Sequence, residues 1–195
     1  MKFKNSDNES DNEDKDFETE IKIKDNEIFF YSDINKQSTL ELRFAMKDLI
    51  KQHKIMAIKM DIDPVPIKLH ICSDGGEVGA AMVIIDLIRG SDVPIWTIVE
   101  GEAMSAATLI SISGHKRLMT QNAHMLIHQI RGGIWGKMNE FEDEYKNMKK
   151  YTKVLKKLYK QFTKLNDEKL ACILKKDILW GSKTCLKYGL VDDII

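Results

Sequence analysis

The sequence has few cysteines, no net charge and no long run of apolar residues. Its three cysteines, Cys72, Cys172 and Cys185, are odd in number and lack the close spacing of a metal or redox motif, which is typical of free thiols in a reducing compartment. Thirty basic and thirty acidic side chains cancel, so the overall charge gives no indication of a nucleic-acid or membrane partner. No stretch approaches transmembrane length, and the N-terminus is too polar for a signal peptide. These absences predict a cytoplasmic protein.

The sequence also shows no phosphate-binding loop, internal repeat or interdomain linker. A length of 195 residues with 43% hydrophobic residues is enough for one domain with a substantial core. Residues 1–20 differ from the rest, because they are rich in Asp, Glu, Asn and Ser and poor in apolar side chains. Such a segment cannot bury enough surface to offset its ordering entropy. We therefore predict a disordered acidic tail at residues 1–20, followed by one domain at residues 21–195.

From Ile21 onward, short apolar segments alternate with amphipathic ones. Strands are expected at residues 27–32, 67–72, 94–101, 116–120 and 124–129, and helices at 38–53, 77–90, 105–114 and 138 to about 165. Ser38 is the expected N-cap of the first helix, with Glu41 completing a capping box. This alternation predicts right-handed crossovers on a largely parallel sheet, an α/β fold. The last helix is longer than a small sheet needs, so it either docks on its own domain or projects toward another subunit.

Four short blocks contain side chains suited to hydrolytic chemistry: SDGG at 73–76, GEAMSAA at 101–107, HMLIHQIRGG at 124–133 and KKDILWGSKTCLKYGLVDDI at 175–194. Ser105 stands at a strand-to-helix turn, where a nucleophile would be exposed and a helix N-terminus would stabilise an anion, although the pattern is not GxSxG. His128 ends an apolar strand, and the Gly75-Gly76 pair can expose backbone N–H groups. Serine, histidine, a late aspartate and such a glycine pair are the parts of a serine hydrolase.

Each of these residues also has an ordinary interpretation when it is taken alone. Ser105 is equally suited to be a helix N-cap, His128 a satisfied core histidine and Asp177 a charge at a helix end. The Gly75-Gly76 pair is equally suited to an ordinary turn. The order of the four blocks therefore carries more information than any one of them.

In that order, over about residues 27–195, the blocks resemble the ClpP family of self-compartmentalised serine peptidases. SDGGEVGAAMVIIDLI is similar to the family's N-S-P-G-G-S-V segment and the helix after it, and GEAMSAATLI to its G-x-A-A-S-M-G/A block. AHMLIHQIRGG is similar to its M-I-H-Q-P-x-G-G block, and D-ILWGSKTCLKYGLVDDI to its D-x-F-x-S-x-x-E-A-x-x-Y-G-L-V-D-x-I terminus. The resemblance implies a triad of Ser105, His128 and Asp177, with the backbone N–H groups of Gly76 and Ala106 as oxyanion donors.

The resemblance also implies a ClpP/crotonase-type superhelix of ββα units with a projecting handle, a helix and a strand, at about residues 131–165. An extended peptide would bind along Gly75, Ile130, Gly132 and Gly133. The implied assembly is a homo-oligomer of two stacked heptameric rings that receives unfolded polypeptides from an AAA+ unfoldase such as a Clp ATPase. No cofactor or metal is implied for the peptidase itself, and no nucleic-acid or membrane partner.

Several residues depart from the family's pattern. Asp74 stands in place of proline and puts a charge beside the implied oxyanion hole. The other departures are Ala106-Ala107 after the nucleophile, Ile130 after His-Gln, Lys175-Lys176 in place of an acidic–arginine pair associated with inter-ring salt bridges, and His70 at an aromatic position associated with unfoldase docking. These departures are typical of a specialised, phage-type member of the family. Three alternatives stay open: a non-catalytic ring subunit, a phage head-maturation protease and a crotonase-like acyl-CoA enzyme.

Overall fold

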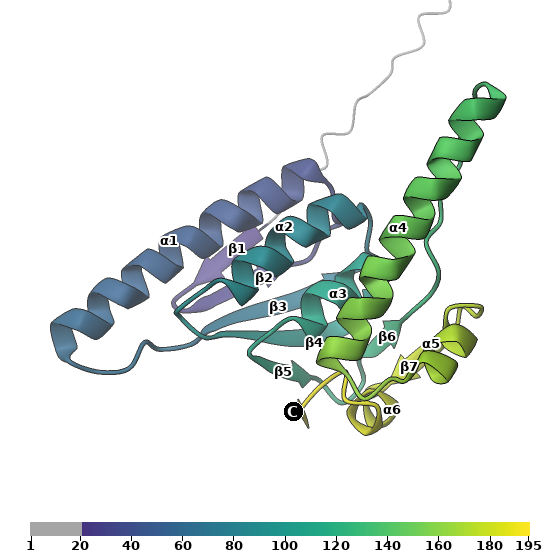
Figure 1. Ribbon diagram of the computed structural model, residues 1–195. Helices are drawn as coiled ribbons and strands as arrows, with labels where there is room; N and C mark the ends of the chain where they lie inside the picture. The colour runs from purple at the N-terminus through teal and green to yellow at the C-terminus, as the bar shows by residue number, and fades with distance from the viewer. Residues whose placement is uncertain (1–20) are drawn as a thin grey trace, which may run out of the picture.

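The computed structural model describes residues 21–195 (Figure 1). The disordered tail predicted at residues 1–20 lies outside the described residues. Within the described range the chain forms eight strands: β1 Ile21–Lys24, β2 Glu27–Phe30, β3 Ile67–Ser73, β4 Ile95–Met104, β5 Lys116–Met119, β6 His124–Leu126, β7 Leu179–Gly181 and β8 Asp193–Ile194. The same residues form six helices: α1 Lys36–Met60, α2 Val78–Arg89, α3 Ala106–Ile112, α4 Met138–Phe162, α5 Asp167–Ile173 and α6 Ser182–Lys187.

The strands form one mixed sheet with the order β1-β2-β3-β4-β5-β8. From β2 to β8 along this path every neighbouring pair is parallel, while β1 is antiparallel to β2. Parallel neighbours need crossover connections, and α1, α2 and α3 supply three of them. The predicted α/β fold with a largely parallel sheet is therefore confirmed.

The longest strand, β4, has different partners along its length on the side away from β3. Residues 96–99 pair with β5, whereas residues 102–104 pair with β6. Gly101 lies between the two segments with a φ of +65°, a conformation that favours glycine. β6 in turn pairs in antiparallel fashion with β7. The end of β4 thus lies between β3 and a small branch of the sheet, and Ser105 is the next residue.

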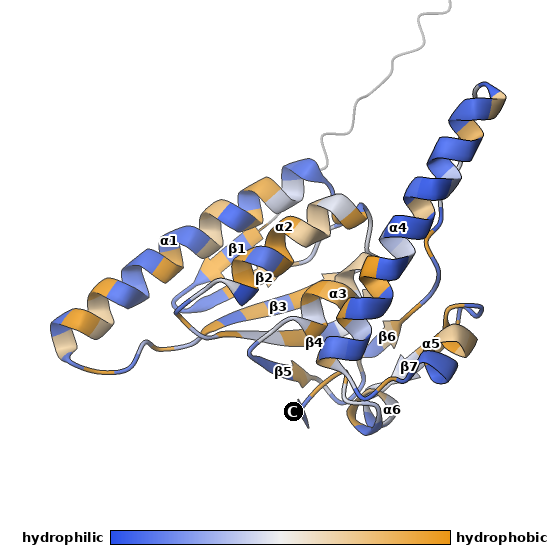
Figure 2. Cartoon of the chain, viewed as in Figure 1, coloured by the Kyte–Doolittle hydropathy of each residue, from blue (hydrophilic) through white to orange (hydrophobic). Residues whose placement is uncertain are grey.

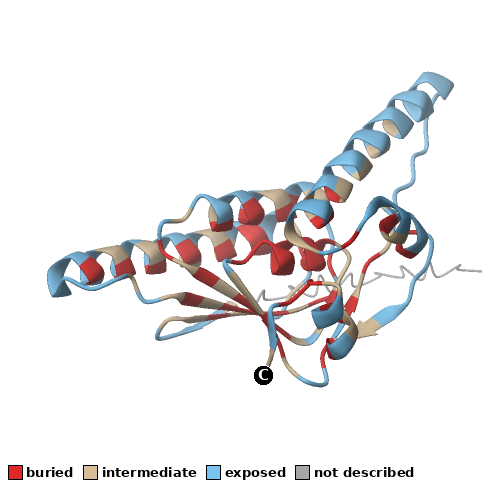
Figure 3. Cartoon of the chain, turned by 60° about the horizontal axis from the view of Figure 1, so that its bottom comes forward, coloured by how far each residue is buried: buried red, intermediate tan, exposed pale blue. Residues whose placement is uncertain are grey.

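The core lies between the sheet and the helices α1, α2 and α3, which cover one of its faces (Figures 1 and 3). On β3, alternate residues Ile67, Leu69 and Ile71 are fully buried on this face. Helix α2 contributes Ile84 and Ile88, which are also fully buried. The short helix α3 is buried along its whole length, so the segment after Ser105 is held rigidly in the core.

The N-cap of the first helix lies three residues earlier than its sequence pattern predicts. Its N-cap is Asn35, whose Oδ1 accepts from the Ser38 backbone N–H at 2.9 Å, while Ser38 Oγ accepts from the Asn35 N–H at 3.1 Å. The predicted N-cap at Ser38 and the capping box with Glu41 are therefore wrong, and Ser38 is the third residue of the helix. The helix also continues past residue 53 to Met60 and ends at Asp61, which adopts the left-handed conformation.

Helix α4 and the extended segment before it stand away from the rest of the protein (Figures 1 and 2). Of the 25 residues of α4, only Leu155 and Tyr159 are buried, both near its C-terminal end. Aromatic side chains on the outer part are exposed, among them Phe141 and Tyr145. Of the two alternatives left open for this helix, docking along its whole length is excluded. The helix projects, with only its base packed on the domain.

Candidate active site

Ser105 occupies a strained turn between β4 and α3. Its φ of 53° and ψ of −120° are unusual for a residue with a side chain and typically cost about 1–3 kcal/mol. The turn is held from both sides, because the Ser105 N–H donates to the Leu126 carbonyl at 2.9 Å and its carbonyl accepts from the Thr108 N–H at 3.1 Å. Within residues 21–195, the hydroxyl itself makes no hydrogen bond. The side chain is thus presented at the end of the strand rather than used as a helix cap.

His128 and Asp177 meet although 49 residues separate them in the chain. His128 Nδ1 lies 3.1 Å from Asp177 Oδ1. The antiparallel pairing of β6 with β7 brings the two segments together, and a hydrogen bond of 3.1 Å from the Gln129 N–H to the Leu174 carbonyl supports them. When Nδ1 carries the proton and donates it to the carboxylate, Nε2 is left as a proton acceptor. This arrangement suits a general base.

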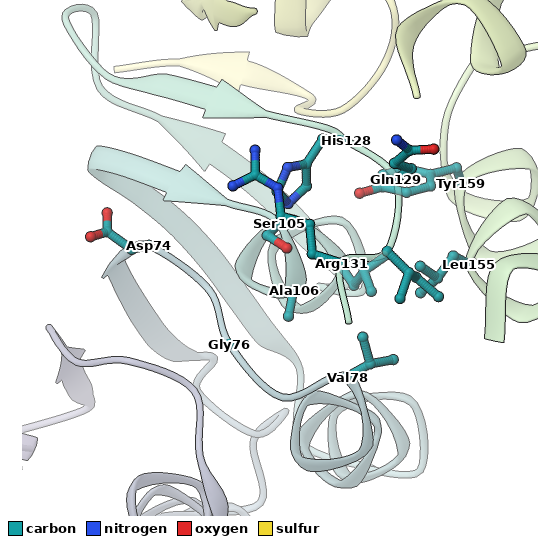
Figure 4. Close-up of a pocket in the computed structure, with 12 residues that line it drawn as sticks. Asp74, Gly76, Val78, Ser105, Ala106, His128, Gln129, Arg131, Leu155 and Tyr159 are labelled. Carbon is teal, nitrogen blue, oxygen red and sulfur yellow. The ribbon is translucent and has the colours of Figure 1, made fainter. Parts of the chain in front are cut away.

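Ser105 and His128 line one pocket of about 190 Å³ (Figure 4), named the active-site pocket below. The imidazole is directed toward Ser105 in this view. Apolar side chains form much of the remaining wall, and two of them, Leu155 and Tyr159, come from the base of α4. The long helix therefore contributes directly to the walls of this pocket.

The glycine turn after β3 packs against the Ser105 turn. Gly75 and Gly76 have φ values of +99° and +141°, and an added Cβ on Gly75 would lie only 2.8 Å from Ser105 Cβ. The turn is anchored by Ile34, which donates to the Gly75 carbonyl and accepts from the Glu77 N–H, both at 2.7 Å. Among the residues that the structure describes, the N–H groups of Gly76 and Ala106 donate to no backbone carbonyl outside the regular elements. Both residues line the active-site pocket, and their role as oxyanion donors stays a prediction.

The four residues predicted to bind peptide are placed differently from one another. Ile130 lines the active-site pocket, and Gly75 lines an adjoining hollow. Gly132 instead lies beside Met148 of α4, and Gly133 is exposed with no atom within 4 Å of an added Cβ. The structure thus brings Ile130 to the pocket and Gly75 beside it, and leaves the Gly132-Gly133 pair outside, along the extended segment that precedes α4.

Sequence reasoning missed an ion pair at the candidate triad. The Arg131 guanidinium contacts Asp177 Oδ2, so the carboxylate is shared between Arg131 and His128. The side chains of Arg131 and Asp177 are 70% and 55% exposed, and Asp74 is exposed at another edge of the pocket. Nothing in the local sequence around Arg131 indicates this contact, because its partner lies 46 residues away.

Burial raises the pKa of Tyr159 above its ordinary range, so the phenol in the pocket wall stays protonated. Within residues 21–195, no group of three or more His, Cys, Asp or Glu side chains is placed to hold a metal ion. No helix in this range is both long enough and apolar enough to cross a membrane.

The fold and the position of the pocket define the class of protein. A mostly parallel sheet covered by helices, with a pocket at the ends of β3, β4 and β6, is an α/β protein whose site lies at the carboxyl ends of its strands. Residues 15–195 match the sequence model described as Clp protease, and the chain belongs to the Clp protease family. The prediction of this family is confirmed.

Curated relatives agree with this assignment. The chain is 31% identical over 170 residues, 86% of its length and 80% of the relative's, to "ATP-dependent Clp protease proteolytic subunit 2" of Treponema denticola. It is 34% identical over 131 residues to "ATP-dependent Clp protease proteolytic subunit" of Deinococcus radiodurans, a match that covers 66% of this chain and 64% of the relative. Family membership supports a protease.

Proposed function

We propose that the protein is a serine endopeptidase that cleaves unfolded polypeptides through Ser105, His128 and Asp177. The observation that carries this proposal is the contact between His128 and Asp177, made across 49 residues of chain beside the pocket that contains Ser105. A His128–Asp177 pair with a purely structural role would give no reason for Ser105 to adopt a strained conformation at the same pocket. The three residue types are those that activate a hydroxyl nucleophile.

The proposed reaction uses each group at a defined atom. His128 Nε2 takes the proton of Ser105 Oγ as that oxygen attacks the peptide carbonyl, and Asp177 stabilises the resulting imidazolium. The C–N bond breaks as His128 returns the proton to the leaving amine, which leaves an acyl-enzyme on Ser105. Water, activated by the same histidine, then hydrolyses the ester and regenerates the hydroxyl.

The backbone N–H groups of Gly76 and Ala106 would stabilise the tetrahedral oxyanion. One such donor typically lowers the barrier by about 2.7–4 kcal/mol. The glycine turn holds the first donor and the start of α3 holds the second. The exposed Asp74 carboxylate lies next to Gly75 in the chain, and its negative charge would oppose an oxyanion there.

Assembly and partners are part of the same proposal. The relatives are named as proteolytic subunits of ATP-dependent Clp proteases, which supports a Clp ATPase as partner. Membership of the family supports a homo-oligomer, which we propose to be two stacked heptameric rings. The exposed aromatic side chains on the projecting part of α4 would then contact another subunit as a handle at about residues 131–165. An extended peptide would bind along the segment from Ile130 to Gly133 and across Gly75 by main-chain hydrogen bonds. We place this machinery in the cytoplasm.

A non-catalytic ring subunit is the second candidate, and two observations favour it. Ser105 makes no side-chain hydrogen bond among the described residues, and Asp177 is shared with Arg131. A ring subunit without activity would retain the fold and the assembly while leaving the serine unactivated. The family match favours either of these two functions over an acyl-CoA enzyme.

Covalent labelling separates the two candidates. The purified protein is treated with a fluorophosphonate probe and its intact mass is measured, with Ser105→Ala as the matched control. A single adduct that is lost in Ser105→Ala supports the peptidase. The absence of an adduct on a folded and assembled protein would refute a resting active triad and favour the non-catalytic subunit.

A further inference from the structure

A buried pair of hydroxyl groups links helix α4 to the turn that holds Ser105. Thr108 Oγ1 of α3 contacts the hydroxyl of Tyr159, which lies 51 residues further along the chain near the base of α4. Thr108 is fully buried and Tyr159 is 3% exposed. Buried hydroxyls that lose their partners are costly, so this contact is a fixed part of the packing between the two helices.

The direction of the hydrogen bonds follows from the number of protons available. Thr108 Oγ1 donates to the Ser105 carbonyl at 2.7 Å, and a threonine hydroxyl has only one proton to donate. Tyr159 must therefore be the donor in its contact with Thr108. Because burial keeps the phenol protonated, this donor is present throughout the ordinary pH range. The chain of donation runs from Tyr159 through Thr108 to the Ser105 carbonyl.

The Ser105 carbonyl is half of the peptide unit whose other half is the Ala106 N–H. A peptide unit is planar, so fixing the direction of the carbonyl also fixes the direction of the N–H, which points the opposite way. The proposed oxyanion donor at Ala106 is therefore oriented by the bonds that its neighbouring carbonyl accepts. Those bonds come from the Thr108 N–H at 3.1 Å and from the Thr108 hydroxyl.

We infer that Tyr159 and Thr108 are positioning residues that orient the Ala106 N–H for the transition state. Through them, the docking of the base of α4 controls how fast Ser105 reacts. Leu155, one turn before Tyr159, lines the same pocket, so a shift of this end of α4 would change the pocket wall and the peptide unit together. The inference rests on the proposed function, because it takes Ser105 as the nucleophile and Ala106 as an oxyanion donor.

The experiment measures fluorophosphonate labelling at increasing probe concentration on the full chain, together with thermal unfolding. Tyr159→Phe removes only the phenolic oxygen, and Thr108→Val removes the hydroxyl at nearly constant shape. Each variant is expected to lower the limiting labelling rate about fivefold, because that is the rate change expected when one neutral hydrogen bond is lost from the transition state. The half-saturating probe concentration should stay unchanged. Thr108→Ser retains the hydroxyl and should retain most of the rate. Tyr188→Phe is the matched control, because Tyr188 lies outside α4 and the active-site pocket and its hydroxyl has no hydrogen-bond partner among residues 21–195.

The double variant tests whether the two hydroxyls act as one chain. Once Thr108→Val has removed the link, adding Tyr159→Phe should cost almost nothing further. Limiting rates equal to wild type in folded Tyr159→Phe and Thr108→Val proteins would overturn the inference, even if both unfold at lower temperature. Fully additive losses would overturn it too. A wild-type protein that forms no adduct overturns the proposed function and this inference with it, whereas a labelled wild type with unaffected variants overturns the inference alone.

Discussion

Replacing Gly75 with alanine would place a methyl group in the contact between the glycine turn and the nucleophile turn. The φ of Gly75 is +99°, and the new Cβ would lie 2.5 Å from the Met104 carbonyl oxygen, 2.8 Å from Ser105 Cβ and 3.1 Å from the Ala106 nitrogen. Two of these three atoms are backbone, so no side-chain rotation can relieve the contact. The two turns would have to move apart.

Both the conformation and the crowding contribute to the cost. A left-handed conformation costs a residue with a side chain about 1–2 kcal/mol, and overpacking a well-filled site typically costs about 1–3 kcal/mol. A total near 3 kcal/mol corresponds to a fall of about 6–12 °C in Tm for a domain of this size. Because displacement by about 1 Å reduces catalysis roughly 100-fold, labelling of Ser105 should fall by a similar factor.

The matched control is Gly79→Ala in helix α2, where an added Cβ would meet no atom within 4 Å. Alanine is favoured over glycine inside a helix by about 0.8–1 kcal/mol, so this variant should be slightly more stable than wild type and label normally. Thermal unfolding followed by circular dichroism, and intact-mass labelling at fixed times, measure both effects. Equal Tm values and labelling rates for Gly75→Ala and Gly79→Ala would show that the two turns are not packed as described.

Two further predictions concern charged residues. Arg131→Ala should change Tm by less than about 3 °C, because exposed ion pairs are weak. It should nevertheless raise the rate of Ser105 labelling severalfold, since Asp177 then interacts with His128 alone. A rate at or below that of wild type would mean that Arg131 instead holds the carboxylate in place. Burial alone would raise the pKa of Asp192, but hydrogen bonds and charge from Arg117 outweigh it and hold that pKa below its ordinary value. A lowered folded-state pKa stabilises the fold above the unfolded-state pKa, near 4, and this contribution is lost as the pH falls. Asp192→Asn should therefore lower Tm at pH 7 and converge with wild type toward pH 3, and a constant difference between pH 7 and pH 3 would contradict this reasoning.

Local sequence patterns were sufficient for the central strands, whereas the candidate triad rests on the resemblance to one family. The strand predicted at residues 67–72 corresponds to β3, because its apolar residues Ile67, Leu69 and Ile71 alternate along the chain and a glycine turn follows it. Ser105, His128 and Asp177 were predicted because their types, order and neighbours matched one family. The structure places His128 against Asp177 and Ser105 in the same pocket as His128, and the catalytic roles of the three residues stay predictions.

Contacts between distant residues account for what the sequence did not reveal. Asn35 and Ser38 are both good helix caps, and the choice between them is made by Ile34, which bridges to Gly76 and fixes where the chain enters α1. The contact between Tyr159 and Thr108 is likewise invisible in the sequence, because it exists only once α4 has packed against α3. Such contacts depend on the fold and leave no local pattern.

The separation of His128 from Asp177 along the chain has a consequence for biosynthesis. A ribosome that has just added His128 must add 49 more residues before the carboxylate exists, which takes about 2–10 s at typical elongation rates. During that interval β7, the antiparallel partner of β6, has not yet been made either. If the proposed triad is correct, the emerging polypeptide contains the serine and the imidazole without their carboxylate, and it would leave neighbouring nascent proteins uncut while it is being synthesised.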